Sequence, residues 1–167
     1  FGAGFSKAFS EKGTYTKIAS WFIILYGFGE GIGSGAFKAN HLANGLTNFA
    51  IIHDILGGIG VTAILLLPLI MQKVITKDEM PLFFRMSKII FLTGIITVFL
   101  FLFRFLHDKN NFFITYKGLW QRLFMLNTYI YLATIAIIMI KNTKTGGMRI
   151  KKSSNPHFHS TPTPTEN

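Results

Sequence analysis

The chain alternates between long apolar segments and short polar ones. Four of the apolar segments are at least twenty residues long, at positions 18–37, 48–72, 82–106 and 118–140. A helix that rises about 1.5 Å per residue needs about 20 residues to cross a hydrocarbon layer roughly 30 Å thick. None of these segments alternates apolar and polar residues with a period of two, as strands of a transmembrane barrel do. The pattern therefore predicts an all-α fold, a polytopic transmembrane bundle with four spans.

Three residues refine the boundaries and shape of these helices. Thr47 or Asn48 is a suitable N-cap for the second helix. Pro81 is suited to the first turn of the third helix, where its missing N–H is harmless. Pro68 lies inside the second segment, and we expect it to bend that helix or to remove one backbone hydrogen bond.

The two ends of the chain lie outside this bundle. Residues 1–17 are partly apolar but contain no segment long enough to cross a bilayer, and we interpret them as the end of an upstream part. Residues 141–167 are first basic and then rich in Ser, Thr and Pro. Such a composition buries too little apolar surface to offset ordering entropy, so it predicts a disordered basic cytoplasmic tail.

Composition agrees with a membrane location. Half of the residues are hydrophobic and 14% are charged, whereas soluble domains carry about 25% charged residues. The chain contains no cysteine, which excludes disulfides, thiolate metal ligands and cysteine nucleophiles supplied by this sequence. The net charge of +10 comes from basic residues that lie mainly between the apolar segments. That distribution indicates membrane orientation rather than binding to nucleic acid.

The basic residues also predict the direction of the crossings. With four spans, twelve Lys and Arg residues fall on one side and five on the other. The side richer in Lys and Arg is normally cytoplasmic. We therefore expect an integral, multi-pass protein of a prokaryotic inner (cell) membrane, with both ends of this chain in the cytoplasm and the lipid bilayer as its main partner.

Five ionisable residues of these segments share the predicted outer leaflet. They are Glu30, His53, Asp54, Arg104 and Arg122. Ionisable groups at such depths are costly and are functional-site candidates. In one interpretation, the two guanidiniums and the two carboxylates neutralise each other and hold the helices together. In the other, they line a cavity that binds a small anionic or lipid ligand, with an arginine holding the anionic group.

A metal site is a weaker interpretation of the same region. His53, Asp54 and His107 are possible ligands, and Glu30 is a possible acid or base. No two histidines have the i, i+4 spacing of a zinc-binding helix, so we predict no metal and no cofactor. The favoured interpretation is an integral membrane protein of unassigned activity, and the sequence does not decide whether it is an enzyme. The alternatives are a membrane-embedded, metal-assisted lipid hydrolase and a small transporter or transporter subunit.

Glycines are dense at the end of the first segment. They define one helix face with a repeat of four residues and a second face beside it: Gly27, Gly31 and Gly35, then Gly29 and Gly33. Such faces let neighbouring helices pack closely. A matching surface on the second segment is offered by three further glycines: Gly57, Gly58 and Gly60. These faces also make a homo-oligomer possible.

The order of several motifs resembles one known family. A Gly-rich span end (GEGIGSGAF) is followed by a short polar loop, a helix that opens IIHDILGGIG, and a last helix that opens Gly118-Leu-Trp-Gln-Arg122. In this order the chain is similar to the family called domain of unknown function 998, multi-pass membrane proteins of bacteria and archaea, over residues 15–140. The resemblance implies that these are the last four spans of a larger bundle. It implies no activity.

Overall fold

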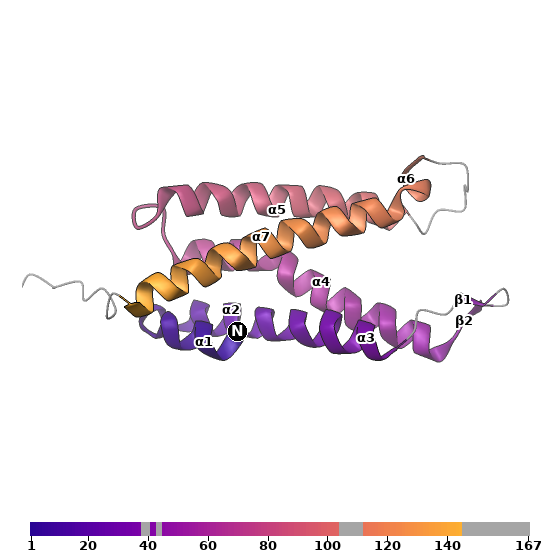
Figure 1. The fold of residues 1–167 in the computed structure, drawn as a ribbon, viewed down its shortest axis with the longest axis horizontal. Helices are drawn as coiled ribbons and strands as arrows, with labels where there is room; N and C mark the ends of the chain where they lie inside the picture. Colours follow the sequence, from indigo (N-terminus) through magenta and orange to yellow (C-terminus); the bar gives the residue numbers. More distant parts are fainter. Residues whose placement is uncertain (38–40, 43–44, 104–111, 145–167) are drawn as a thin grey trace, which may run out of the picture.

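The computed structural model describes residues 1–37, 41–42, 45–103 and 112–144. Its elements are mostly helices that run along one long axis (Figure 1). In chain order they are α1 (Gly2–Ala8), the 3-10 helix η1 (Ser10–Lys12), α2 (Thr14–Tyr26), the π-helix η2 (Gly27–Gly33), α3 (Ser34–Ala36), β1 (His41–Leu42), β2 (Gly45–Leu46), α4 (Asn48–Val74), α5 (Pro81–Leu102), α6 (Phe112–Thr115) and α7 (Lys117–Lys144). The two short strands pair antiparallel, with His41 opposite Leu46.

Three helices of the described part are long and apolar enough to cross a membrane: Asn48–Val74, Pro81–Leu102 and Gly118–Asn142. They correspond to the second, third and fourth predicted segments. Thr47 caps α4, because its side chain accepts a hydrogen bond from the Ala50 amide at 3.2 Å. Pro81 begins α5 as expected. Two boundaries differ from the prediction. At the start of the bundle, α2 begins at Thr14, and Phe5 and Phe9 of the N-terminal segment pack into the core. At its end, α7 continues through Lys144, so residues 141–144 are helical, and 145–167 lie outside the described residues.

The first predicted segment is built differently from the other three. Its backbone is helical without a gap from Thr14 to Ala36, but the helix type changes twice, from α2 to η2 and then to α3. Phe37 is extended and ends the helix. Glycine occupies every second position from 27 to 35, and glycine has little preference for α-helical geometry. The π-helix, a rare form that is frequent at functional sites, therefore occupies the glycine-rich part.

The helices form two pairs. α2 and η2 pack along α4, and α5 packs along α7; α4 and α5 join one pair to the other, while α1 lies against α2 (Figure 1). We call the end with η1 and the α4–α5 connection the turn end, and the end with α3 and the two strands the hairpin end. In Figure 1, α4 changes direction partway along its length, and Pro68 is the proline inside this helix.

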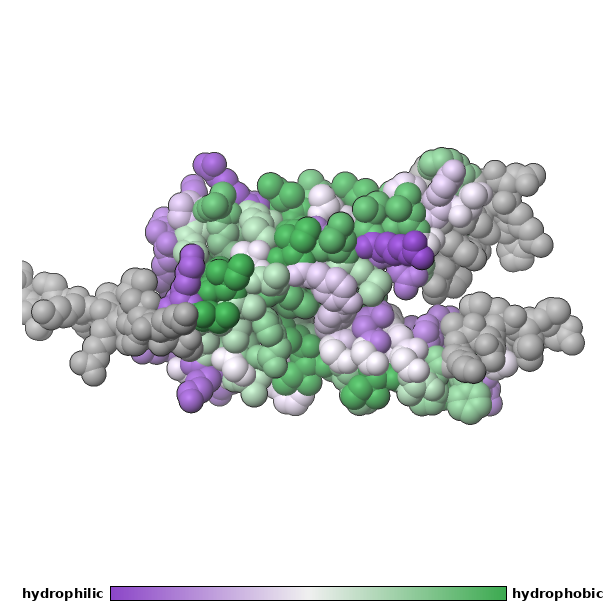
Figure 2. All heavy atoms as spheres, viewed as in Figure 1, coloured by the Kyte–Doolittle hydropathy of each residue, from purple (hydrophilic) through white to green (hydrophobic). Residues whose placement is uncertain are grey.

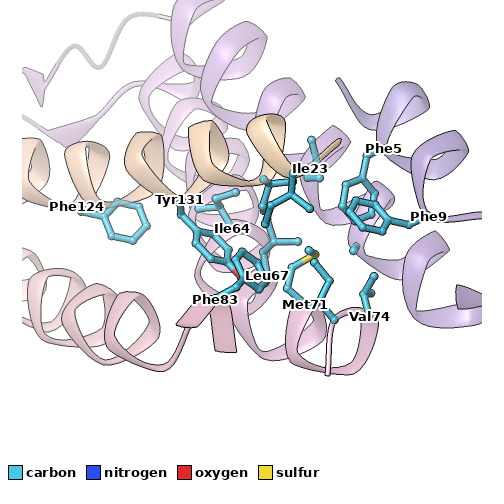
Figure 3. Packing of buried hydrophobic residues seen from close by; sticks show 14 residues of the cluster. Phe5, Phe9, Ile23, Ile64, Leu67, Met71, Val74, Phe83, Phe124 and Tyr131 are labelled. Carbon is cyan, nitrogen blue, oxygen red and sulfur yellow. The ribbon is translucent and has the colours of Figure 1, made fainter. Parts of the chain in front are cut away.

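The buried core lies toward the turn end. Figure 3 shows Phe5 of α1 and Phe9, which directly follows α1, near Met71 and Val74 of α4, in a cluster that also contains Phe83 and Tyr131. The Phe83 and Tyr131 rings are stacked, with centroids 5.7 Å apart. At the other end of α7, residues 121–123 are exposed. The two pairs are thus tightly packed at the turn end and less so at the hairpin end, where the surface is hollowed between them (Figure 2).

Apolar side chains also cover the outside of the bundle. Along α5, Ile89, Leu92 and Phe99 are each about 60% exposed, at 62%, 59% and 60%. Hydrophobic residues dominate the middle of the molecule in Figure 2, and hydrophilic residues gather near its ends. Exposed apolar surface on this scale is expected where lipid replaces water.

Candidate functional site

Two glycines bring η2 into backbone contact with α4. A Cβ atom on Gly29 would lie 2.5 Å from the Leu56 carbonyl oxygen and 3.0 Å from the Gly60 backbone. A Cβ atom on Gly33 would lie 2.7 Å from the Leu56 side chain. The second predicted glycine face is therefore confirmed as a packing face. The first face behaves differently: Cβ atoms on Gly27, Gly31 and Gly35 would meet no described atom within 4 Å, and the same holds for Gly58.

The close packing positions the Glu30 side chain against α4. Glu30 and Ser34 are half-buried and both lie over Gly57, where an added Cβ would be 3.5 Å from Glu30 Oε1 and 3.3 Å from Ser34 Oγ. The Ser34 hydroxyl lies 3.4 Å from the Gly29 carbonyl and also interacts with the Glu30 carboxylate. The absence of a side chain at position 57 thus leaves room for a carboxylate between the two helices.

His53 faces the same carboxylate from α4. The ring lies near enough to Glu30 for an electrostatic interaction, and its Nδ1 lies 2.8 Å from the Phe37 carbonyl oxygen. A carbonyl can only accept a hydrogen bond, so Nδ1 carries a proton and Nε2 is the ring nitrogen left for another partner. The same bond satisfies a carbonyl at the end of the first helix, which would otherwise lack a donor.

The other side of the hollow is formed by α7. Tyr129 of α7 interacts with Tyr26 of α2, which in turn lies near Glu30. Arg122 precedes Tyr129 by seven residues, almost two full turns, so both lie on the same face of α7. Arg122 is exposed, and no described residue forms an ion pair with it. Arg122 therefore lies on the face of α7 that carries Tyr129, nearer to the hairpin end of the helix.

The predicted cluster is assembled only in part. The structure brings Glu30 and His53 together and leaves Asp54 half-buried beside His53 on α4. Arg104 and His107 lie outside the described residues. The mutual neutralisation of carboxylates by guanidiniums is not formed by Arg122, because its side chain is exposed and unpaired within the described part.

The candidate metal site is not assembled within the described ranges. Histidine, aspartate and glutamate side chains there form no set of three or more that could hold an ion. His53 and Asp54 are adjacent in sequence, so their side chains leave the helix about 100° apart. The third candidate, His107, lies outside these ranges.

Three hydroxyl residues of the site did not stand out in the sequence. They are Tyr26, Ser34 and Tyr129. Tyrosine and serine are common in apolar helices, so their identity alone gives no signal. Their spacing did offer a signal for two of them. Tyr26, Glu30 and Ser34 follow each other at intervals of four residues and so share a helix face. Tyr129 could not be found in this way, since its role depends on how α7 is rotated.

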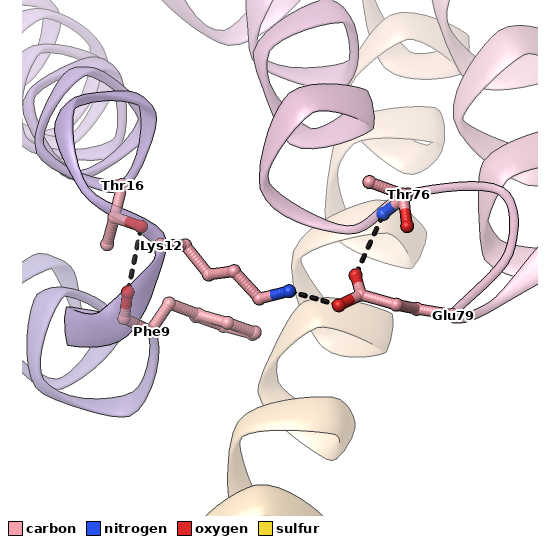
Figure 4. A network of polar contacts seen from close by, with 5 residues as sticks. All are labelled: Phe9, Lys12, Thr16, Thr76 and Glu79. Atoms are coloured by element: carbon pink, nitrogen blue, oxygen red, sulfur yellow. Dashed lines mark hydrogen bonds and ion pairs between the residues drawn. The ribbon is translucent and has the colours of Figure 1, made fainter. Parts of the chain in front are cut away.

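A second polar site lies at the turn end. Lys12 of η1 pairs with Glu79 in the connection between α4 and α5, and Glu79 also accepts a hydrogen bond from the Thr76 amide at 3.0 Å (Figure 4). The hydrogen bond from Lys12 is the main reason that the pKa of Glu79 lies below its ordinary value, with the Thr76 amide adding to it. The pair borders a cavity of about 370 Å³ whose base includes Phe9, Ile75 and Ile138. The contact joins η1 to the turn between the two helix pairs.

Comparisons with known proteins yield no match. No family model matches the chain, no curated protein matches it, and no solved structure matches it. The resemblance to domain of unknown function 998 therefore stays a prediction.

Proposed function

We propose that the protein crosses the membrane four times, with α2, η2 and α3 together forming the first crossing. Their unbroken helical backbone from Thr14 to Ala36 is roughly 34 Å long at 1.5 Å per residue, which exceeds a hydrocarbon layer of about 30 Å. Glu30 is the only charged residue between Lys17 and Lys38. With four crossings, the excess of basic residues favours a cytoplasmic turn end and an outer hairpin end. This arrangement is also what membership of domain of unknown function 998 implies.

In this bundle, the hollow at the hairpin end serves as a binding site for a small anionic or lipid ligand. The observation that carries the proposal is the exposed guanidinium of Arg122, unpaired among described residues, on the face of α7 that looks toward the half-buried Glu30 and His53. A guanidinium binds phosphate or carboxylate through two parallel hydrogen bonds. The free Nε2 of His53 accepts a hydrogen bond from a hydroxyl, or donates one when the ring is protonated. A lipid headgroup that has both a phosphate and a hydroxyl can bind Arg122 through the phosphate and His53 through the hydroxyl.

The test compares two arginine variants of the purified protein. Phosphatidylglycerol carries a phosphate and two hydroxyls, whereas phosphatidylcholine has no net charge and no hydroxyl. Native mass spectrometry of protein titrated with both lipids should show a preference for phosphatidylglycerol that Arg122→Gln loses. Arg85→Gln is the matched control, because Arg85 is an exposed guanidinium at the turn end of α5. Equal loss in both variants would mean that only general attraction between charges is at work, and the proposal would be wrong.

A transporter is the second candidate, and the π-helix favours it. Irregular helix next to a charged residue is a feature of transporter binding sites, where the backbone changes during the cycle. The chain has no cysteine, so single cysteines at Ser34 and Gly57 can be labelled from one side of sealed vesicles with a membrane-impermeant maleimide. Labelling from both sides supports alternating access. Labelling from the hairpin side alone supports a fixed binding site.

A further inference from the structure

A small notch lies where α4, α5 and α7 meet, away from the hollow at the hairpin end. It is lined by Ile64 and Pro68 of α4, Gly94 of α5, and Asn127 and Thr128 of α7, among others. The space open to the centre of a water-sized sphere is about 10 Å³, which is close to the smallest space that holds one water molecule. Most of the lining is apolar, so the polar groups that reach it decide what occupies it.

One of these polar groups is supplied by the proline. Pro68 lies inside α4 and has no N–H, so the carbonyl of Ile64, four residues earlier, lacks its usual donor. Freed carbonyls at prolines in membrane helices are satisfied by neighbouring side chains, by ordered water or by local changes of helix type. Both Ile64 and Pro68 border the notch.

The second polar group is the Thr128 hydroxyl. Thr128 is 4% exposed and lines the notch, and no hydrogen bond joins its side chain to any described residue. Thr134, on the same helix, instead donates to the Ile130 carbonyl at 2.9 Å. The neighbouring Asn127 amide is already engaged across the interface, donating to the Ile90 carbonyl at 2.9 Å and accepting from Thr93 at 3.0 Å. No side-chain oxygen or nitrogen in the described part of the chain is both buried and without a hydrogen-bond partner, so the Thr128 oxygen is itself accessible, and the notch that Thr128 lines is the space open to it.

We propose that the notch binds one water molecule, which donates to the Ile64 carbonyl and accepts from the Thr128 hydroxyl. The water would connect α4 to α7 beside Pro68, and so join the two helix pairs. Its second hydrogen remains available for another acceptor in the notch. This site is separate from the hollow at the hairpin end, and the proposal does not depend on the function of that hollow.

The sign of one substitution tests the proposal. Thr128→Val keeps the shape of the side chain and removes its hydroxyl. If water bridges the two groups, the variant loses one hydrogen bond of the bridge and its Tm falls below that of Thr134→Val, the matched control at a half-buried threonine of the same helix. If the notch is dry, Thr128→Val removes a hydroxyl that has no hydrogen-bond partner in the notch, its Tm rises above the control, and the proposal is overturned.

Repeating the substitution in a Pro68→Ala variant separates the effect of the bridging water from simple packing effects. Pro68→Ala restores the N–H that the Ile64 carbonyl lacks, so the water loses its acceptor on α4. The Tm decrease caused by Thr128→Val should therefore shrink when Pro68→Ala is also present. An equal decrease in both backgrounds would show that Thr128 acts through packing alone and would overturn the proposal. A cryo-electron microscopy map at about 2 Å should show density for the water next to Thr128 Oγ1, and an empty notch would contradict it.

Discussion

The contact between η2 and α4 gives a prediction with an internal control. In Gly29→Ala, the new methyl carbon would lie 2.5 Å from the Leu56 carbonyl oxygen and 3.0 Å from Cα and N of Gly60. All three are backbone atoms, so relief requires the two helices to separate. In Gly31→Ala, two residues along the same π-helix, the new methyl meets no described atom within 4 Å.

The difference between the two variants isolates the packing term. Overpacking a well-packed contact costs about 1–3 kcal/mol, while replacing glycine by alanine in a helix returns about 0.5–1 kcal/mol. The helix term is common to both variants and cancels in the comparison. We therefore expect Gly29→Ala to be less stable than Gly31→Ala by about 1–3 kcal/mol, with Gly31→Ala equal to the parent or slightly more stable.

Equilibrium unfolding in mixed detergent micelles, followed by the fluorescence of Trp21 and Trp120, measures both free energies. Circular dichroism of the folded variants checks that helix content is unchanged. Equal stability of the two variants would refute the close approach of η2 to α4. A loss in Gly31→Ala accompanied by a smaller particle in size-exclusion chromatography would instead show that the first glycine face packs against another copy of the chain.

Three further predictions concern other contacts. Arg122→Leu should change the unfolding free energy by no more than about 0.5 kcal/mol, as surface substitutions do, when measured by the same micelle unfolding; a loss of about 3–5 kcal/mol would restore the interpretation as a buried ion-pair network. Since the pKa of Glu79 is lowered in the folded protein by Lys12, the stabilisation by this pair is present at neutral pH and is lost as the pH falls through the folded pKa. Thermal unfolding between about pH 6 and 3, around the ordinary glutamate value near 4.3, should therefore show a Tm decrease on acidification that is smaller in Glu79→Gln. Ser87→Ala leaves the buried Tyr131 hydroxyl without the partner that it has at 2.8 Å and should cost about 1–3 kcal/mol, much of which the added Tyr131→Phe should restore in a double-mutant cycle.

Hydropathy and local signals predicted the helices that are regular. The bounds of α4 follow from an apolar run preceded by a good N-cap, Thr47, and those of α5 from Pro81. These signals act within a few residues and need no tertiary structure. The change from α2 to η2 is different, because the glycines permit many backbone forms and the contact with Leu56 and Gly60 accompanies the one adopted here.

The candidate site shows a similar division. Membrane depth can be counted along a helix, so Glu30 and His53 were predicted at a common level, and the structure brings them together. Rotation about the helix axis cannot be counted in that way, because lipid and protein neighbours both suit apolar residues. For this reason the sequence did not reveal that Arg122 is exposed, that Tyr129 interacts with Tyr26, or that the Phe37 carbonyl accepts a hydrogen bond from Nδ1 of His53.

The uneven packing of the two helix pairs has a mechanical consequence. Phe5, Met71 and Phe83 are nearly inaccessible beside the turns, so moving the two pairs apart there would expose apolar side chains that are now buried. Residues 121–123 of α7, at the hairpin end, are already exposed, so the same movement there breaks less apolar contact. We therefore expect a change in bilayer thickness, which acts on helix tilt, to alter the spacing of the two pairs more at the hairpin end than at the turn end.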